Sequence, residues 1–267
     1  ANTGSVYSWT LPAGAALVGD PTAASITVMF GTNSGNISVR ETNAAGCITN
    51  HNPLTVTVNA LPTANISNSG TICVEGTHSI NITLTGVAPW NIIYAINGTA
   101  QPSIPVAASP HVMTVNTPGT YTIVSVTDAN LCTSPGTGTA TVSNYPVPTG
   151  TISGTGEMCP GGSRTITVSL TGAAPYTFIY TDGATSVTMT DYPSAVYTFN
   201  VTPATTTTYT LTSLTDNHGC IGTLTGSAII TVNPLPVLSL AGTNPLCNGD
   251  INGEIDLTVA SGTPGYN

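Results

Sequence analysis

Three segments of the chain alternate apolar and polar side chains at similar distances after a cysteine. A period of two places the apolar side chains on one face of a β-strand and the polar ones on the other. We therefore predict three half-buried antiparallel strands in equivalent places of a repeated unit. Their apolar positions are Ile80, Ile82 and Leu84; Ile166, Val168 and Leu170; and Ile255, Leu257 and Val259.

A Gly/Pro turn and an aromatic residue follow each of these segments. The turns read GVAPW, GAAPY and GTPGY, which places Trp90, Tyr176 and Tyr266 in matching positions. Tyr94 and Tyr180 then recur in the strands that follow the first two turns. Short strands separated by turn residues at this spacing are typical of a β-sandwich, with a closed barrel as the less favoured alternative.

The end of the unit is also repeated, together with the connection to the next unit. GTYTIVSVTDANLC (119–132) and TTYTLTSLTDNHGC (207–220) match each other, and GNISVRETNAAGC (35–47) is an earlier copy. After each comes a strand and then a proline, which suits a strand end and a short stiff connector. In the segments that follow, Pro62, Pro148 and Pro236 each stand eleven residues before a cysteine. We interpret these Pro-to-Cys segments as junctions between successive units.

The repeats predict an all-β chain of tandem antiparallel β-sandwich domains with a period of about 85 to 88 residues. Two complete domains are expected, at 61–147 and 148–236. We expect residues 1–60 to be the later part of one further domain whose N-terminal part is missing, and residues 237–267 to be the beginning of another.

The six cysteines follow the same period. Successive gaps alternate between 26 or 27 residues and 59 or 61 residues. Pairing within a domain gives Cys73–Cys132 and Cys159–Cys220, one disulfide per domain, and each closed loop of about 60 residues adds roughly 4 kcal/mol of stability. Disulfides indicate an oxidising, extracellular setting, whereas reduced and buried thiols are the alternative interpretation.

Cys47 and Cys247 have no partner within their own incomplete domains. Joining the end of the chain to its beginning would separate them by about 67 residues, close to the other long gaps. They therefore pair outside this stretch of sequence, or with each other across a junction between subunits. In the second case, residues 237–267 of one subunit complete the first domain of the next by strand addition. We favour a window from a longer array, because a half-domain does not order by itself.

The charge of the chain excludes several classes of partner. Only 5% of residues are charged, the basic residues are Arg40 and Arg164 alone, and the net charge is −9. Nucleic acids and anionic membrane surfaces require clustered Lys and Arg, so neither is expected as a partner. No apolar run reaches eighteen residues, so no membrane insertion is expected.

Three segments resemble a known group of bacterial repeats. GTYTIVSVTDANLC is similar to the end of PKD-like and Ig-like repeats in giant surface adhesins of Bacteroidota, although Leu131 stands where glycine is usual. Residues 6–47 resemble the PKD-like type, and residues 246–266 resemble the start of a gliding-motility adhesin repeat. The resemblance implies type IX secretion, a cell-surface location, a structural or adhesive role in tandem arrays, and no chemistry.

Few residues are candidates for a binding or catalytic site. G-x-S-x-G is absent and the acidic residues are scattered, so we expect no enzyme activity and no cofactor. The strongest metal candidate is a calcium loop in DINGEID, with Asp250, Asn252, Glu254 and Asp256 as oxygen ligands. Position six of that loop is Ile255 rather than glycine, which weakens the match to an EF-hand. A second candidate, residues 216–219, is better interpreted as a turn with local Asx hydrogen bonds.

Aromatic residues that recur in phase offer one more binding surface. Trp9, Trp90, Tyr94, Tyr176 and Tyr180 would suit stacking against a sugar. Because they occupy equivalent places in successive units, packing in the core or at the end of a domain is the preferred interpretation.

The sequence as a whole predicts a non-enzymatic structural or adhesive segment of a large extracellular cell-surface adhesin or filament. It would act as a disulfide-stabilised stalk. Its partners would be neighbouring repeats of the same chain, identical subunits joined head to tail, or a surface polysaccharide. The alternative is an accessory stalk or carbohydrate-binding module of a secreted polysaccharide-degrading enzyme.

Overall fold

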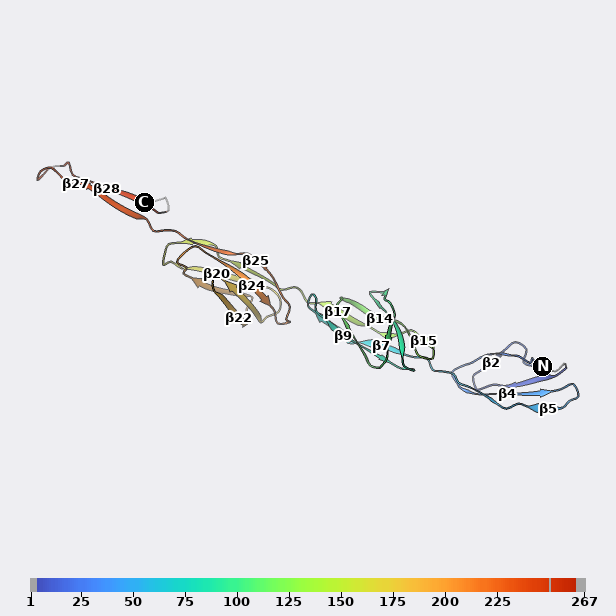
Figure 1. Cartoon of the computed structure of the whole chain (residues 1–267). Helices are drawn as coiled ribbons and strands as arrows, with labels where there is room; N and C mark the ends of the chain where they lie inside the picture. Colours follow the sequence, from blue (N-terminus) through green and yellow to red (C-terminus); the bar gives the residue numbers. More distant parts are fainter. Residues whose placement is uncertain (1–3, 250, 263–267) are drawn as a thin grey trace. The chain divides into compact units, whose positions relative to one another are not determined.

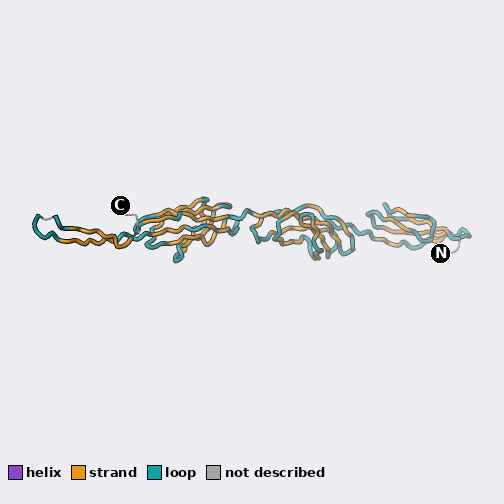
Figure 2. The backbone as a smooth tube through the Cα atoms, turned by 90° about the horizontal axis from the view of Figure 1, so that it is seen from above, coloured by secondary structure: helices purple, strands orange, loops and turns teal. Residues whose placement is uncertain are grey.

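The computed structural model describes residues 4–249 and 251–262, which form strands joined by turns (Figures 1 and 2). No helix occurs among these described residues, so none is long enough to span a membrane, and the predicted all-β class is confirmed. The contacts divide the chain into two compact units. Unit 1 comprises Ala1–Gly70 and Thr77–Ser143, and unit 2 comprises Thr71–Gly76 and Asn144–Asn267.

In the first part of unit 1, four strands form one open sheet and two form a separate ribbon. The sheet has the order β1-β4-β5, and β6 also pairs with β4, while β2 pairs with β3. Of residues 4–60, only Pro12 is buried, because the described strands place no second sheet over the first. These strands are β1 (Val6–Thr10), β2 (Ala16–Val18), β3 (Thr27–Met29), β4 (Gly35–Thr42), β5 (Ile48–Asn50) and β6 (Leu54–Val56).

Residues 64–144 form a closed sandwich of two sheets. One sheet has the order β13-β9-β7-β16, and the other has the order β11-β10-β14-β17-β8, with β12 on β10 and β15 on β14. Ile66 and Ile82 from the first sheet and Ile92, Tyr121 and Val126 from the second are fully buried. The strands are β7 (Ala64–Ser67), β8 (Gly70–Ile72), β9 (His78–Leu84), β10 (Trp90–Ile96), β11 (Thr99–Ala100), β12 (Ile104–Val106), β13 (His111–Val115), β14 (Gly119–Thr127), β15 (Thr133–Ser134), β16 (Thr137–Gly138) and β17 (Ala140–Asn144).

Residues 149–232 repeat this architecture within unit 2. The sheets have the orders β23-β20-β18-β25 and β19-β26-β24-β21-β22. Ile152, Ile166 and Val168 of the first sheet meet Phe178 and Leu214 of the second in one buried cluster. The strands are β18 (Thr149–Ser153), β19 (Gly156–Met158), β20 (Arg164–Leu170), β21 (Tyr176–Thr181), β22 (Ser186–Tyr192), β23 (Val196–Val201), β24 (Thr207–Thr215), β25 (Thr223–Thr225) and β26 (Ala228–Val232).

Both sandwiches have the strand arrangement of an immunoglobulin-like fold. In the second sandwich β18, β20 and β23 share one sheet, and β21, β22, β24 and β26 share the other, as β7, β9 and β13 and then β10, β14 and β17 do in the first. Most strand pairs in these sheets are antiparallel, and the exceptions lie at one place. Where the first and last strands of a sandwich meet they are parallel, as β16 is to β7, β25 to β18 and β26 to β19. The first strand of the second sandwich passes from one sheet to the other, as β18 and then β19. In the first sheet β18 pairs with β25, and in the other β19 pairs with β26.

The last described element is a two-stranded hairpin of β27 (Val237–Thr243) and β28 (Glu254–Ser261). Leu240 lies opposite Leu257, as Ile152 lies opposite Val168 in the preceding sandwich. The burial of these matched pairs differs greatly. Leu240 and Leu257 are 72% and 60% exposed, whereas Ile152 and Val168 are 1% and 0% exposed.

Candidate functional site

A five-residue loop that begins with Asn or Asp and ends with Cys occurs three times in the structure. We call the segments 43–47, 128–132 and 216–220 the Asx loops. In each, one side-chain oxygen of the first residue accepts hydrogen bonds from the backbone N–H groups of the third and fifth residues, at 2.8–3.1 Å. The cysteine carbonyl in turn accepts the N–H of the first residue. This closed ring of bonds fixes the backbone that carries the cysteine.

The fourth residue of each Asx loop has a left-handed backbone. Its φ is +84° at Gly46, +64° at Leu131 and +78° at Gly219. Glycine adopts this conformation without strain, whereas a leucine pays a steric cost there. The departure from glycine at Leu131 is therefore a substitution within a conserved backbone shape, and the loop keeps its geometry.

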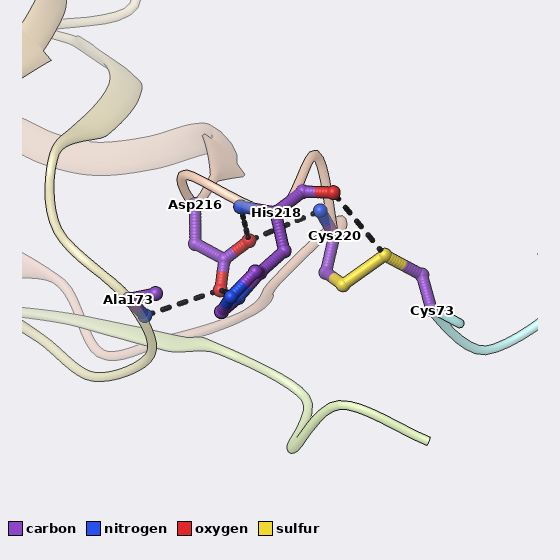
Figure 3. Close-up of a disulfide and its surroundings, with 5 residues drawn as sticks. All are labelled: Cys73, Ala173, Asp216, His218 and Cys220. Atoms are coloured by element: carbon purple, nitrogen blue, oxygen red, sulfur yellow. Dashed lines mark hydrogen bonds and ion pairs between the residues drawn. A yellow bond between two sulfur atoms is a disulfide. The ribbon is translucent and has the colours of Figure 1, made fainter. Parts of the chain in front are cut away.

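The Asx loop of residues 216–220 contains a buried carboxylate (Figure 3). Asp216 is 6% exposed, and its Oδ2 accepts the N–H of Ala173 at 3.1 Å, while Oδ1 accepts those of His218 and Cys220. Burial by itself would raise the pKa of Asp216, but the hydrogen bonds to its ionised form outweigh burial and leave that pKa below its ordinary value. The carboxylate therefore stays charged and holds three backbone donors.

A second repeated turn carries the other cysteine of each sandwich. Cys73 and Cys159 each open a four-residue turn, in which the glycine N–H at the fourth position donates to the cysteine carbonyl. The third residue, Glu75 or Gly161, has a φ of +65° or +82°. We call residues 73–76 and 159–162 the Cys turns, and their shared shape makes the two cysteines structural equivalents.

The structure joins a Cys turn to an Asx loop. Cys73 and Cys220 form a disulfide with a Cα–Cα distance of 5.2 Å, and both residues belong to unit 2 (Figure 3). The pairing predicted from the sequence, Cys73–Cys132 and Cys159–Cys220, is therefore wrong. Cys159 is instead an exposed free thiol, and Cys132 is a partly buried one.

The reason is the length of the strand that separates the two cysteines of one sandwich. Met158 lies opposite Val232 in β26, and β26 pairs with the start of β24 at Thr207. Cys159 is therefore beside the start of β24, whereas Cys220 follows its end. Nine residues of strand span about 30 Å, and a disulfide requires Cα atoms within about 7 Å. The two cysteines of this sandwich cannot meet.

Aromatic and apolar side chains surround the disulfide. The rings of Tyr145 and His218 stack with centroids 3.7 Å apart. Beside the bond is an open apolar groove of about 640 Å³ whose lining includes the exposed Val74, Val147 and Ile221. His218 Nδ1 lies 3.5 Å from Asp216 Oδ2, which resembles a catalytic dyad. The two sulfur atoms beside this dyad are bonded to each other, so neither can act as a nucleophile.

The calcium candidates are only partly described. Asp250 lies outside the described residues, and the side chain of Asn252 accepts the N–H of Leu246 at 3.2 Å. Glu254 and Asp256 are exposed on β28. Within residues 4–249 and 251–262, no group of three His, Cys, Asp or Glu side chains could hold a metal ion. The second candidate, residues 216–219, is the Asx turn that the sequence predicts, with its carboxylate occupied by backbone donors.

The recurrent aromatic residues take up packing positions. Trp90 and Tyr176 are 6% and 3% exposed, which confirms the prediction of core packing for these two. Tyr180 is partly buried and stacks on Phe199 with centroids 4.3 Å apart. Burial, followed by its interaction with Tyr197, raises the pKa of Tyr180 to about 12. Trp9 is also partly buried, and its indole N–H donates to the carbonyl of Ala23 at 3.0 Å.

One family model matches a part of this chain. Residues 1–56 match the family model of a PKD-like domain. No curated protein sequence matches the chain. Among solved structures, the I-band fragment I67-I69 from titin is 12% identical, with a TM-score of 0.46 over 88% of this chain and 89% of that one. The fibronectin(III)-like modules of CbhA from Clostridium thermocellum are 14% identical, with a TM-score of 0.28 over 64% of this chain and 94% of theirs.

We call the part of the chain that matches this family model, residues 1–56, the PKD-like region, and its Asx loop begins with Asn rather than Asp. Asn43 supplies an amide oxygen in place of a carboxylate and binds the N–H groups of Ala45 and Cys47 at 3.0 and 2.8 Å. Cys47 at the end of the loop is an exposed free thiol. The PKD-like region therefore presents the same kind of cysteine that Cys220 uses in its disulfide.

Proposed function

We propose that this chain is a non-enzymatic structural and adhesive repeat segment of a large extracellular adhesin or filament at the cell surface. The Ig-like sandwiches and the PKD-like region support a structural or adhesive module. The disulfide and the PKD-like match support an extracellular location, because disulfides persist in oxidising compartments. Export by the type IX pathway, a role in gliding motility and binding to surface polysaccharide are further parts of the proposal, and they rest on the sequence resemblance alone.

The observation that carries the proposal is the long span of the disulfide. Cys73 and Cys220 are 147 residues apart in sequence. When the two ends of the chain are pulled, the covalent path runs through the sulfur–sulfur bond and bypasses residues 74–219. Most strands of both sandwiches lie in the bypassed segment, from β9 to β24. A stalk under tension would then keep most of its folded structure out of the load path.

Stretching single molecules by their ends tests this role. The oxidised chain is expected to reach a final length shorter than that of the reduced chain by about 50 nm, because extended residues span at most about 3.6 Å each. A Cys73→Ser variant should behave like the reduced chain even under oxidising conditions. Cys159→Ser, which removes an equivalent cysteine outside the bond, should leave the oxidised length unchanged. Equal lengths for the oxidised wild-type chain and Cys73→Ser would contradict the proposed load path.

A further inference from the structure

The PKD-like region has an uncovered apolar groove. The groove holds about 440 Å³, and its lining includes Trp9 and Ile37 from the four-stranded sheet, Val28 from β3, and Phe30, which follows β3. Leu54 on β6 also lines it and is 66% exposed. In the closed sandwiches, the equivalent sheet face is covered by the opposite sheet. Apolar surface of this kind favours a partner that removes it from water.

The hairpin β27–β28 has an apolar face that no second sheet covers among the described residues. Leu238, Leu240 and Leu257 lie on one face and are 58%, 72% and 60% exposed. Ile255 continues the same row two residues before Leu257 and is 80% exposed. Its strand β28 pairs with β27 alone in the part of the chain that the structure describes, so its other edge is open.

The register of the hairpin shows which surface it fits. Leu238 opposite Val259 and Leu240 opposite Leu257 reproduce the pairs Gly150–Leu170 and Ile152–Val168 of β18 and β20. In that sandwich, β18 and β20 cover the sheet that contains β21, β24 and β26. The PKD-like region supplies the counterparts of those three strands in β1, β4 and β6, because the Asx loop follows β4 as it follows β24.

We propose that the hairpin β27–β28 of one copy of this chain covers the apolar groove of the PKD-like region in a second copy. The open edge of β28 would pair with β3 of the second copy, as β20 pairs with β23 in the closed sandwich. The row of leucine and isoleucine side chains on the hairpin would face Trp9, Ile37 and Leu54. The assembly deepens the proposed structural role, on which it rests, by naming its partner as a second copy joined head to tail.

The docking also pairs two cysteines that the single chain leaves as exposed thiols. Cys159 is in the Cys turn beside the end of β26, the strand that precedes the hairpin, and Cys47 is in the Asx loop of the region that the hairpin would complete. The same combination of Cys turn and Asx loop forms the bond between Cys73 and Cys220. Cys159 would therefore bond to Cys47 of the second copy. The two thiols lose two protons and two electrons to a small-molecule disulfide such as oxidised glutathione, which is reduced to two thiols.

Isotope mixing tests the cross-link directly. Equal amounts of ¹⁴N-labelled and ¹⁵N-labelled chain are mixed, oxidised with glutathione disulfide, digested with pepsin and examined by non-reducing mass spectrometry. We expect Cys159–Cys47 peptide pairs that carry one label of each kind, and a ladder of multimers that collapses on reduction. Pairing between chains produces mixed-label and single-label pairs together, so a complete lack of mixed-label pairs would place both cysteines in the same chain. That outcome, or the absence of the pair, would overturn the proposal.

Matched variants on the two faces of the hairpin separate docking from chance oxidation. Leu240→Asp and Leu257→Asp place a charge on the apolar row, whereas Ser239→Asp and Thr258→Asp place it on the opposite face of the same strands. Burying an unpaired carboxylate is costly, so the first pair should raise the dissociation constant of the reduced assembly by at least about 100-fold. The second pair should change it little. Equal effects of both pairs, or a wild-type chain that stays monomeric in light scattering, would overturn docking. The stretching experiment measures a bond within single chains, so its outcome does not depend on whether two copies dock.

Discussion

The closed sandwich of residues 149–232 and the open sheet of residues 6–56 use similar strands with opposite results for burial. Ile152, Ile166 and Val168 in the sandwich are at most 1% exposed, whereas Pro12 is the only buried residue of positions 4–60. Both regions have alternating apolar positions and the same Asx loop. The difference is the first pair of strands, which the sandwich has in β18 and β20. Alternation therefore specifies strands, but a core forms only where a second sheet is present to cover the first.

The largest expected difference is in the free energy of unfolding lost when equivalent residues of the sandwich and of the hairpin are replaced by alanine. Ile152→Ala should lower the free energy of unfolding by about 2–5 kcal/mol, because it removes buried methyl groups and leaves a cavity. Leu240→Ala at the equivalent exposed position should change the stability of the monomer by less than about 0.5 kcal/mol. Urea unfolding of the reduced, monomeric chain, followed by tyrosine fluorescence, measures both. A large loss for Leu240→Ala in the monomer would mean that the hairpin is already covered within its own chain.

The Asx loops give the next comparison, between a buried carboxylate and an exposed amide. Asp216→Ala would leave the N–H groups of Ala173, His218 and Cys220 without their acceptor, and should cost about 2–4 kcal/mol. Asn43→Ala removes two bonds at an exposed loop and should cost about 1 kcal/mol or less. Thermal unfolding followed by circular dichroism, with each variant measured against wild type, gives both values. Similar losses would show that burial of the carboxylate contributes nothing beyond the loop bonds.

The same loop predicts a response to acid. Because the folded-state pKa of Asp216 is lowered, its stabilising contribution is complete above the unfolded carboxyl pKa of about 3.9. It is lost as the pH falls through the folded-state value. Asp216→Asn has no carboxyl group to titrate, so the stability difference between wild type and this variant should shrink as the pH falls from 5 to 2. A difference that stays constant over that range would contradict the assignment.

The smallest expected effect concerns the left-handed position of the Asx loops. Leu131→Gly should stabilise the loop of residues 128–132 by up to about 1 kcal/mol, since Leu131 is 84% exposed and little packing is lost. Gly219→Ala introduces the opposite change at the equivalent position, where an added Cβ meets open space, and should cost about 1 kcal/mol. Paired thermal melts check the two signs. Matching signs would show that backbone conformation does not govern these positions.

The sequence predicted the strands and the all-β class because a period of two and the turn residues recur along the chain. It also predicted the Asx turn at residues 216–219 and the burial of Trp90 and Tyr176. It did not predict the disulfide, because spacing shows which cysteines recur but not at which end of a strand each one lies. The length of β24 decides that question, since Cys159 is beside its start and Cys220 follows its end. Residues 207–215 alternate as one nine-residue strand, and a strand of that length keeps the cysteines at its two ends too far apart to bond.

The bond between Cys73 and Cys220 also affects how the chain withstands proteolysis. Any single cut between residues 74 and 219 opens the loop but leaves both fragments attached through sulfur. Arg164 is the only Lys or Arg in that interval. A trypsin-like protease that cleaves after Arg164 would therefore leave a molecule of unchanged mass, apart from one added water, until a reductant separated the pieces.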